Sequence, residues 1–265
     1  MQKQPNIRAN PRPEWIPISR SFFLLLSRKR LFGLSFLLIL TTIGLTWIGY
    51  LVTVDLVDRL TVGFMASPPA TETVWGWIKY SSWVAVSWLF LVVSRIVAFY
   101  FAFLLAYTVT TPGYAFLSAA AERIHAGDEF DPDAAFTLAG IVRDILEGIK
   151  IALFGLGVTV AALVVNFIPG LGQLAVILLY TYYSALMFLD YPASRRRWTL
   201  GRKIDWMRVH GGSTFRIGIL PALLSMIPLL NIFVIALLFP VLTVHATLNF
   251  SSIEVGRKLA ARPAA

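Results

Sequence analysis

The chain has 265 residues, of which 57% are hydrophobic and only 14% are charged. Soluble globular domains carry about a quarter charged residues, so this composition excludes an ordinary soluble domain and indicates a protein solvated by lipid. The 23 lysines and arginines outnumber the 14 aspartates and glutamates, giving a net charge of +9, and in a membrane protein such an excess favours contact with anionic lipid over nucleic-acid binding.

Residues 1–30 form a basic N-terminal segment, and they show no pattern of a cleaved signal peptide. From residue 31 to 54 there is no charged side chain. As a helix this stretch is about 36 Å long, which is enough to cross a hydrocarbon core of about 30 Å. The basic residues before it outnumber those after it, so we expect a transmembrane helix over 31–54 with the N-terminus in the cytoplasm.

A second apolar run, 81–111, follows an aromatic cluster typical of the headgroup level and predicts a second transmembrane helix. Arg95 lies near its midpoint, where an unpaired charge is costly. We consider Glu122, Asp144 and Glu147 as candidate counter-ions, with a passing anion as another. Because the run is longer than a bilayer requires, Arg95 could also simply reach an interface.

After Pro112 the chain becomes amphipathic, and we expect helices on the cytoplasmic surface over 113–148. Within 134–150, apolar side chains recur at helical spacing and charged ones share the other side. The acidic turn at 127–133, with an Asp before a Pro, predicts the helix start.

Two further apolar stretches, 149–190 and 213–250, are each broken in the middle by a proline and predict two helical hairpins. A basic loop lies between them and the tail, 251–265, is also basic, so both hairpins start and finish on the cytoplasmic side. The first arm of the second hairpin has too few uncharged residues to span, so we expect it to turn back within the membrane. The predicted fold is thus an all-α integral membrane protein with one membrane domain, 31–250. It comprises two long transmembrane helices, two partly penetrating hairpins and an amphipathic surface helix.

The broken hairpins carry the polar groups of greatest interest. Backbone groups at a turn inside the membrane must face protein or water, so such turns mark either a pathway or a buried helix-to-helix turn. Helix N-terminal amides at the first turn could attract anions. The candidates are Gly170, Gly172 and Gln173 in the first turn and Asn231 in the second.

A basic cluster, Arg28, Lys29 and Arg30, precedes the first long helix. It either sets topology and contacts lipid phosphate, or collects anions at the mouth of a pathway by raising their local concentration.

Catalytic patterns are poor. The three histidines are far apart and match no metal-binding spacing, and the absence of cysteine removes thiolate ligands and nucleophiles. There is no phosphate-binding loop for ATP. We therefore expect neither an enzyme nor a bound cofactor or metal.

Three motifs carry a resemblance: residues 167–173, then 190–192, then 226–231. In this order and spacing they resemble the CysZ-type sulfate permeases, members of the etoposide-induced-protein domain family. The resemblance implies an oligomeric inner-membrane protein that passes sulfate inward for cysteine synthesis. It also implies an anion site at a Gly-x-Arg-Arg stretch, where this chain has 27–30 and keeps the charge without the glycine. The family's charged helix after the second span is similar to 112–127, where Glu122 matches an acidic position. Glu122, Arg123 and Arg95 are therefore further pathway candidates.

The leading hypothesis is therefore a homo-oligomeric anion permease or channel, most simply for sulfate, in the bacterial inner membrane, with anionic lipids as its other partners. The alternative is a non-transporting protein whose hairpins shape the bilayer or support a partner complex. It predicts no conduction and no anion dependence of thermal stability.

Overall fold

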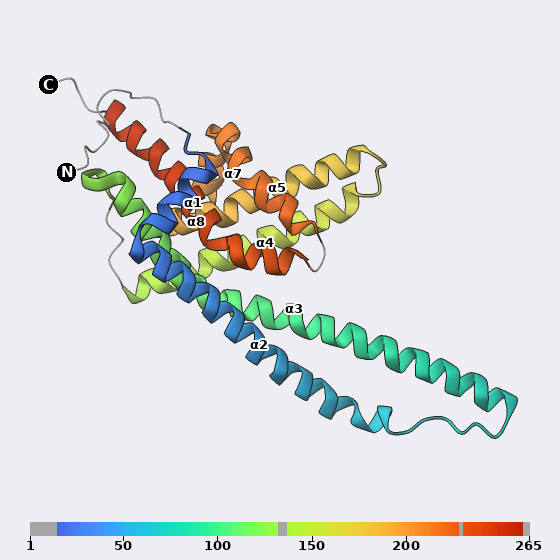
Figure 1. The fold of residues 1–265 in the computed structure, drawn as a ribbon. Coiled ribbons are helices and arrows are strands. Elements are labelled where there is room, and N and C mark those ends of the chain that lie inside the picture. Colours follow the sequence, from blue (N-terminus) through green and yellow to red (C-terminus); the bar gives the residue numbers. More distant parts are fainter. Residues whose placement is uncertain (1–14, 132–136, 228–229, 262–265) are drawn as a thin grey trace. The chain divides into compact units, whose positions relative to one another are not determined.

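The computed structural model is all-helical and describes residues 15–131, 137–227 and 230–261 (Figure 1). Five of its helices contain stretches long and apolar enough to cross a membrane, which confirms the predicted all-α membrane protein. The helices are α1 (Ile18–Ser27), α2 (Lys29–Met65), α3 (Val74–Ala126), α4 (Leu138–Val165), α5 (Leu171–Ser194), α6 (Leu200–Val209), α7 (Gly211–Ser225) and α8 (Leu230–Ala260), with a short 3-10 turn, η2, at Gly127–Glu129.

The chain divides into two compact units, and the smaller one, Leu37–Pro112, is a pair of antiparallel helices formed by parts of α2 and α3 (Figure 1). Gly49 lets the helices approach, because a Cβ there would lie 3.1 Å from the Cβ of Ala102. Thr42 donates a hydrogen bond to the Thr110 hydroxyl at 3.4 Å. Most large apolar side chains of this unit remain exposed, such as Trp88 at 68%, which is the pattern of a surface solvated by lipid.

The helix expected to end at residue 111 continues to Ala126. Pro112 lies inside α3, where it lacks an amide proton for the helix but does not end it. Residues 113–126 are therefore the last turns of α3 and not a separate surface helix, which corrects the expected boundary.

The amphipathic stretch and the next apolar run also form one helix. α4 begins after Thr137, whose hydroxyl accepts a hydrogen bond from the Gly140 amide at 3.1 Å, and it runs to Val165. α4 as described therefore begins after this cap, while Pro132, the proline of the Asp-Pro step that predicts a helix start, lies outside the described residues.

The larger unit, residues 1–36 with 113–265, has its core around α8. In α8, 67% of the 18-residue apolar stretch that could span a membrane is buried, against 17–28% of the same stretch in the other four candidate spans. α7 approaches α5 closely, since a Cβ on Gly218 would meet the carbonyl oxygen of Thr181 and lie 3.0 Å from the Cβ of Ala185. Side chains of α4 to α8 fill this core, including Ile151, Leu186, Phe188, Trp198, Trp206, Met207, Ile217, Leu242 and Phe250.

α1 lies within the basic N-terminal segment, where no helix was expected. Polar contacts hold its start against α8. The Ile16 amide donates to Asn249 Oδ1 at 2.9 Å, and Asn249 Nδ2 donates back to the Ile16 carbonyl at 3.0 Å. Ser21 Oγ lies 3.2 Å from His245 Nδ1. These buried pairs fix the helix that leads into the basic cluster.

Candidate functional site

The basic cluster lies at a break between two helices. Arg28 is extended (φ −102°, ψ 104°) and separates α1 from α2. Its amide still donates to the Leu24 carbonyl at 3.3 Å, and its carbonyl accepts from the Phe32 amide at 3.0 Å. α2 therefore begins at Lys29, and the first amides of α2 have no carbonyl acceptor within the helix.

The three side chains at this break, Arg28, Lys29 and Arg30, are all exposed. In the described part of the chain none of them forms an ion pair. A cation at a helix N-terminus opposes the helix dipole by about 0.3–1 kcal/mol, whereas an anion there is stabilised. The break thus gathers three basic side chains and a helix N-terminus, and no acidic side chain in the described ranges balances them.

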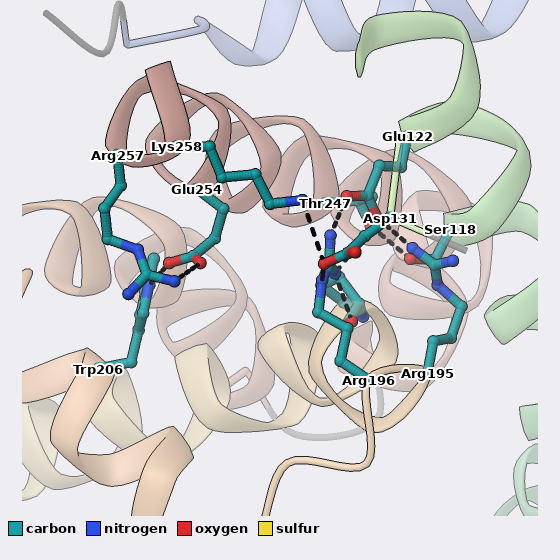
Figure 2. A network of polar contacts seen from close by, with 11 residues as sticks. Ser118, Glu122, Asp131, Arg195, Arg196, Trp206, Thr247, Glu254, Arg257 and Lys258 are labelled. Atoms are coloured by element: carbon teal, nitrogen blue, oxygen red, sulfur yellow. Dashed lines mark hydrogen bonds and ion pairs between the residues drawn. The ribbon is translucent and has the colours of Figure 1, made fainter. Parts of the chain in front are cut away.

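A second group of charges is buried between α3, η2 and the segment after α5 (Figure 2). Glu122 is only 1% exposed and pairs with Arg195 and Arg196, whose side chains are 8% and 10% exposed. Arg196 also donates to the Pro192 carbonyl at 2.8 Å and through Nε to Asp131 at 3.1 Å. One carboxylate thus holds two buried arginines, and a second carboxylate completes the shell.

These contacts shift two pKa values. Burial opposes ionisation of Asp131, but hydrogen bonds and charges from Arg196 and Lys258 outweigh it and lower its pKa below the usual 3.8. Burial likewise opposes the charge of Arg196, but Glu122 and Asp131 outweigh it and raise the pKa of the guanidinium. Asp131 and Arg196 are therefore both charged at neutral pH.

Two more carboxylates fix α6. Asp190 accepts from Lys203 Nζ at 2.5 Å and from Ser194 Oγ at 2.7 Å. Glu147 accepts from the Leu200 amide and from Lys150 Nζ, both at 2.7 Å. These contacts join α6 to α4 and α5. Glu147 therefore pairs with Lys150 and the Leu200 amide and is not the counter-ion of Arg95.

Arg95 has a different partner from those proposed. Its guanidinium donates to both oxygens of Asp58, at 2.7 and 2.9 Å. Glu122 pairs with Arg195 and Arg196 instead, and the Asp144 side chain lies outside the described residues. The proposed counter-ions are therefore wrong for the two that are described, because Asp58 on α2 supplies the charge.

The first hairpin turn, between α4 and α5, largely satisfies its own backbone. The Leu171 amide donates to the Pro169 carbonyl at 2.9 Å, and the Gly172 amide donates to the Ile168 carbonyl at 2.8 Å. These two amides are therefore not free to bind an anion, contrary to the expectation that helix N-terminal amides at this turn could attract one. Gly170 has a φ of +76°, a conformation that glycine adopts without strain.

The remaining candidates are spread over the chain. Gln173 is exposed on α5. Asn231 donates to the Ser225 carbonyl at 3.0 Å and so closes the end of α7, while the proline of that turn, Pro228, lies outside the described residues. The Arg123 guanidinium lies 4.8 Å from the centre of the Phe130 ring. Within the larger unit Glu122 thus lies together with buried arginines, and no hydrogen bond or ion pair of the described residues joins it to Gly170, Gly172, Gln173 or Asn231.

Two pairings could not be predicted from the sequence. Arg195 and Arg196 belong to a basic loop expected on the cytoplasmic side, and no local pattern indicates that they pair with the buried Glu122. Asp58 lies on α2, just beyond the uncharged run 31–54, and its distance from Arg95 along the chain gives no sign that the two side chains pair.

Comparison with known proteins identifies the group to which these features belong. The family model described as "Sulfate transporter CysZ/Etoposide-induced protein 2.4" matches residues 18–236. The chain belongs to this family. On this chain the match to the CysZ family covers α1, the basic break, Glu122 and both hairpin turns. The C-terminal part of α8 lies beyond it. The CysZ family is a family of transporters and not of enzymes.

Curated relatives agree with this assignment. The chain is 27% identical over 192 residues to a "Sulfate transporter CysZ" of Pseudomonas paraeruginosa, covering 71% of this chain and 74% of the relative. It is 26% identical over 189 residues to a protein of the same name from Pseudomonas aeruginosa, covering 69% and 74%. With five candidate spans and bacterial relatives of this kind, it is a multi-pass membrane protein.

Proposed function

We propose that the protein is an inner-membrane permease for a sulfate-like anion and supplies sulfate for cysteine synthesis. The observation that carries this proposal is the break at Arg28, where three exposed basic side chains and a helix N-terminus have no protein anion among the described residues. This break falls inside the family match. The N-terminus and the basic loops lie in the cytoplasm in this proposal.

The physical basis is electrostatic. A helix start offers amide donors and a partial positive charge, and adjacent guanidinium groups match the oxygens of an oxyanion. Three cations also raise the local concentration of anions. Arg28, Lys29 and Arg30 would therefore form the site at which the anion is first held.

The hairpins fit a partly penetrating arrangement in this proposal. The first turn presents exposed apolar side chains, with Phe167 at 88% and Leu171 at 71%, which suits insertion into lipid. α7 has 15 residues and would extend only about 22 Å, which is less than a bilayer core. We assign Gly170, Gly172, Gln173 and Asn231 to the route across the membrane, with water or protein around their polar groups.

The buried charges would support the route indirectly. Glu122 fixes Arg195 and Arg196, and Arg123 is exposed on the same helix turn, where it could contact a passing anion. Arg95 would serve as a structural ion pair, since Asp58 already balances its charge. The exposed apolar faces of the Leu37–Pro112 unit would meet lipid and a second copy of the chain.

Uptake of labelled sulfate by vesicles that contain the purified protein tests the proposal. Uptake above that of empty vesicles, competed by excess unlabelled sulfate, is the expected result. Uptake equal to that of empty vesicles would contradict it.

The exposed apolar tip of the first hairpin also favours a second candidate, a protein that wedges into one leaflet and shapes the bilayer or supports a complex. This function predicts no sulfate uptake. Replacing Phe167 and Leu171 with Ser would then abolish vesicle remodelling, while sulfate would not change the melting temperature.

A further inference from the structure

A cavity of about 300 Å³ lies in the larger unit between the segment after α5, the start of α6 and the end of α8, and the basic cluster at 28–30 does not line it. Its charged lining contains four cations and two carboxylates. The residues are Asp131, Arg196, Trp198, Arg202, Glu254, Arg257 and Lys258. Its size is at the lower end of small-molecule pockets, which run from about 300 to 1,000 Å³.

The two carboxylates of this cavity are already occupied (Figure 2). Asp131 accepts from Arg196 Nε at 3.1 Å and faces Lys258 Nζ at 3.4 Å. Glu254 accepts from Trp206 Nε1 at 3.0 Å and from Arg257 at 2.7 Å. Each carboxylate therefore accepts from two donors, and neither carboxylate bonds Arg202, the remaining cation of the lining.

Arg202 is the cation left over. Its guanidinium stacks over the buried Trp198 ring, 4.2 Å from the ring centre, and no carboxylate among the described residues bonds it. Thr199 accepts from its backbone amide at 3.4 Å and so fixes the first turn of α6. The aromatic face holds the planar group while its N–H donors stay available.

Arg257 lies on the same cavity and has donors to spare. One of its terminal nitrogens bonds Glu254, and its side chain is 62% exposed. Two guanidinium groups with free donors can together grip the oxygens of a tetrahedral anion, which single lysines do less well.

We propose that this cavity binds a phosphate or sulfate group, carried by a lipid headgroup or by a soluble anion, through Arg202 and Arg257. The site stands independently of the transport proposal. Its α8 residues, Glu254, Arg257 and Lys258, lie beyond the range of the family match. The site therefore combines residues inside the family match, Arg202 among them, with α8 residues outside it.

The test measures binding to delipidated protein in detergent, in an Arg28→Ala/Arg30→Ala background that removes the other anion candidate. Two probes are titrated, inorganic phosphate and dioleoylphosphatidic acid, with dioleoylphosphatidylcholine as the neutral comparison. Arg202→Gln is the test variant. Arg208→Gln is the matched control, because Arg208 is exposed on the same helix and does not line the cavity.

Arg202→Gln is expected to weaken binding about tenfold, the loss of one charge-assisted hydrogen bond, while Arg208→Gln leaves it unchanged. Loss with inorganic phosphate identifies a soluble anion, and loss only with phosphatidic acid identifies a headgroup. If Arg202→Gln folds poorly, Arg257→Gln provides the same test. Binding that is unaffected by these variants, or weakened equally by Arg208→Gln, would overturn the site.

Discussion

Glu122 and Arg196 lie 74 residues apart in the sequence, yet their side chains form an ion pair that is 1% and 10% exposed. Arg195 bonds the same carboxylate. A single acid near the end of α3 therefore fixes the segment that follows α5, and with it the position of α6.

Glu122→Gln should strongly destabilise the protein, because it removes the buried carboxylate that both Arg195 and Arg196 bond. Removing one partner of a buried pair costs about 3–5 kcal/mol. The melting temperature in detergent measures the loss. Asp55→Asn serves as control, since the Asp55–Arg59 pair is 60% and 76% exposed and is worth about 0–1 kcal/mol. Equal effects of the two variants would contradict the structural role of Glu122.

The Asp131 contacts predict a pH dependence. The pKa of this carboxyl is lowered from 3.8 by Arg196 and Lys258 against the opposing effect of burial. A lowered folded-state pKa gives stability that is complete above the unfolded value and is lost as the pH falls through the folded value. The difference in melting temperature between the unmodified protein and Asp131→Asn should therefore be constant from pH 7 to pH 5 and shrink below about pH 4. A difference that persists at lower pH would show that another contact is responsible. Asp128→Asn, at an exposed residue of η2, should show no such change.

The approach of α7 to α5 predicts that Gly218→Ala is destabilising. A Cβ there would meet the Thr181 carbonyl oxygen, so the two helices must separate, at a cost of about 1–3 kcal/mol. Gly157→Ala is the control, because a Cβ on Gly157 has open space around it, and alanine in a helix is favourable by about 0.5–1 kcal/mol. Thermal unfolding of both variants measures the contrast. A Gly218→Ala protein as stable as the control would mean that the helices are not in contact.

The Arg95–Asp58 pair predicts non-additive mutations. Asp58→Asn leaves Arg95 unpaired in an apolar unit, and Arg95→Gln leaves the acid unpaired, so each should lower the amount of protein in the membrane. The double variant should do less harm than the sum of the two, because neither charge is then isolated. Membrane yield and melting temperature measure the coupling. Additive effects would contradict the pair.

The sequence predicted elements whose signal is local and left out those that depend on distant contacts. The uncharged run 31–54 and the glycine at 170 indicated a long helix and a tight turn, and α2 and the turn after α4 have those features. The continuation of α3 through Pro112 was not predicted because proline usually ends a helix, yet the turns that follow it here are held by packing, with Tyr114 and Leu117 both fully buried.

The candidate site was harder to predict from the sequence for the same reason. The basic triplet at 28–30 is visible in the sequence, and the break that makes it a helix start is not. The arginines that bury against Glu122 and the cavity around Arg202 arise from residues dozens of positions apart, and no periodicity links them.

The initial rate of sulfate uptake by vesicles holding either the unmodified protein or Arg28→Ala/Arg30→Ala is the most direct measurement. The matched control is Arg143→Ala/Arg208→Ala, which removes the same charge from exposed positions elsewhere. The proposed role predicts a loss of about tenfold or more for the first variant, as expected for removing charge-assisted bonds to the anion, and a rate close to that of the unmodified protein for the control. Equal rates for both variants would contradict an anion site at the start of α2.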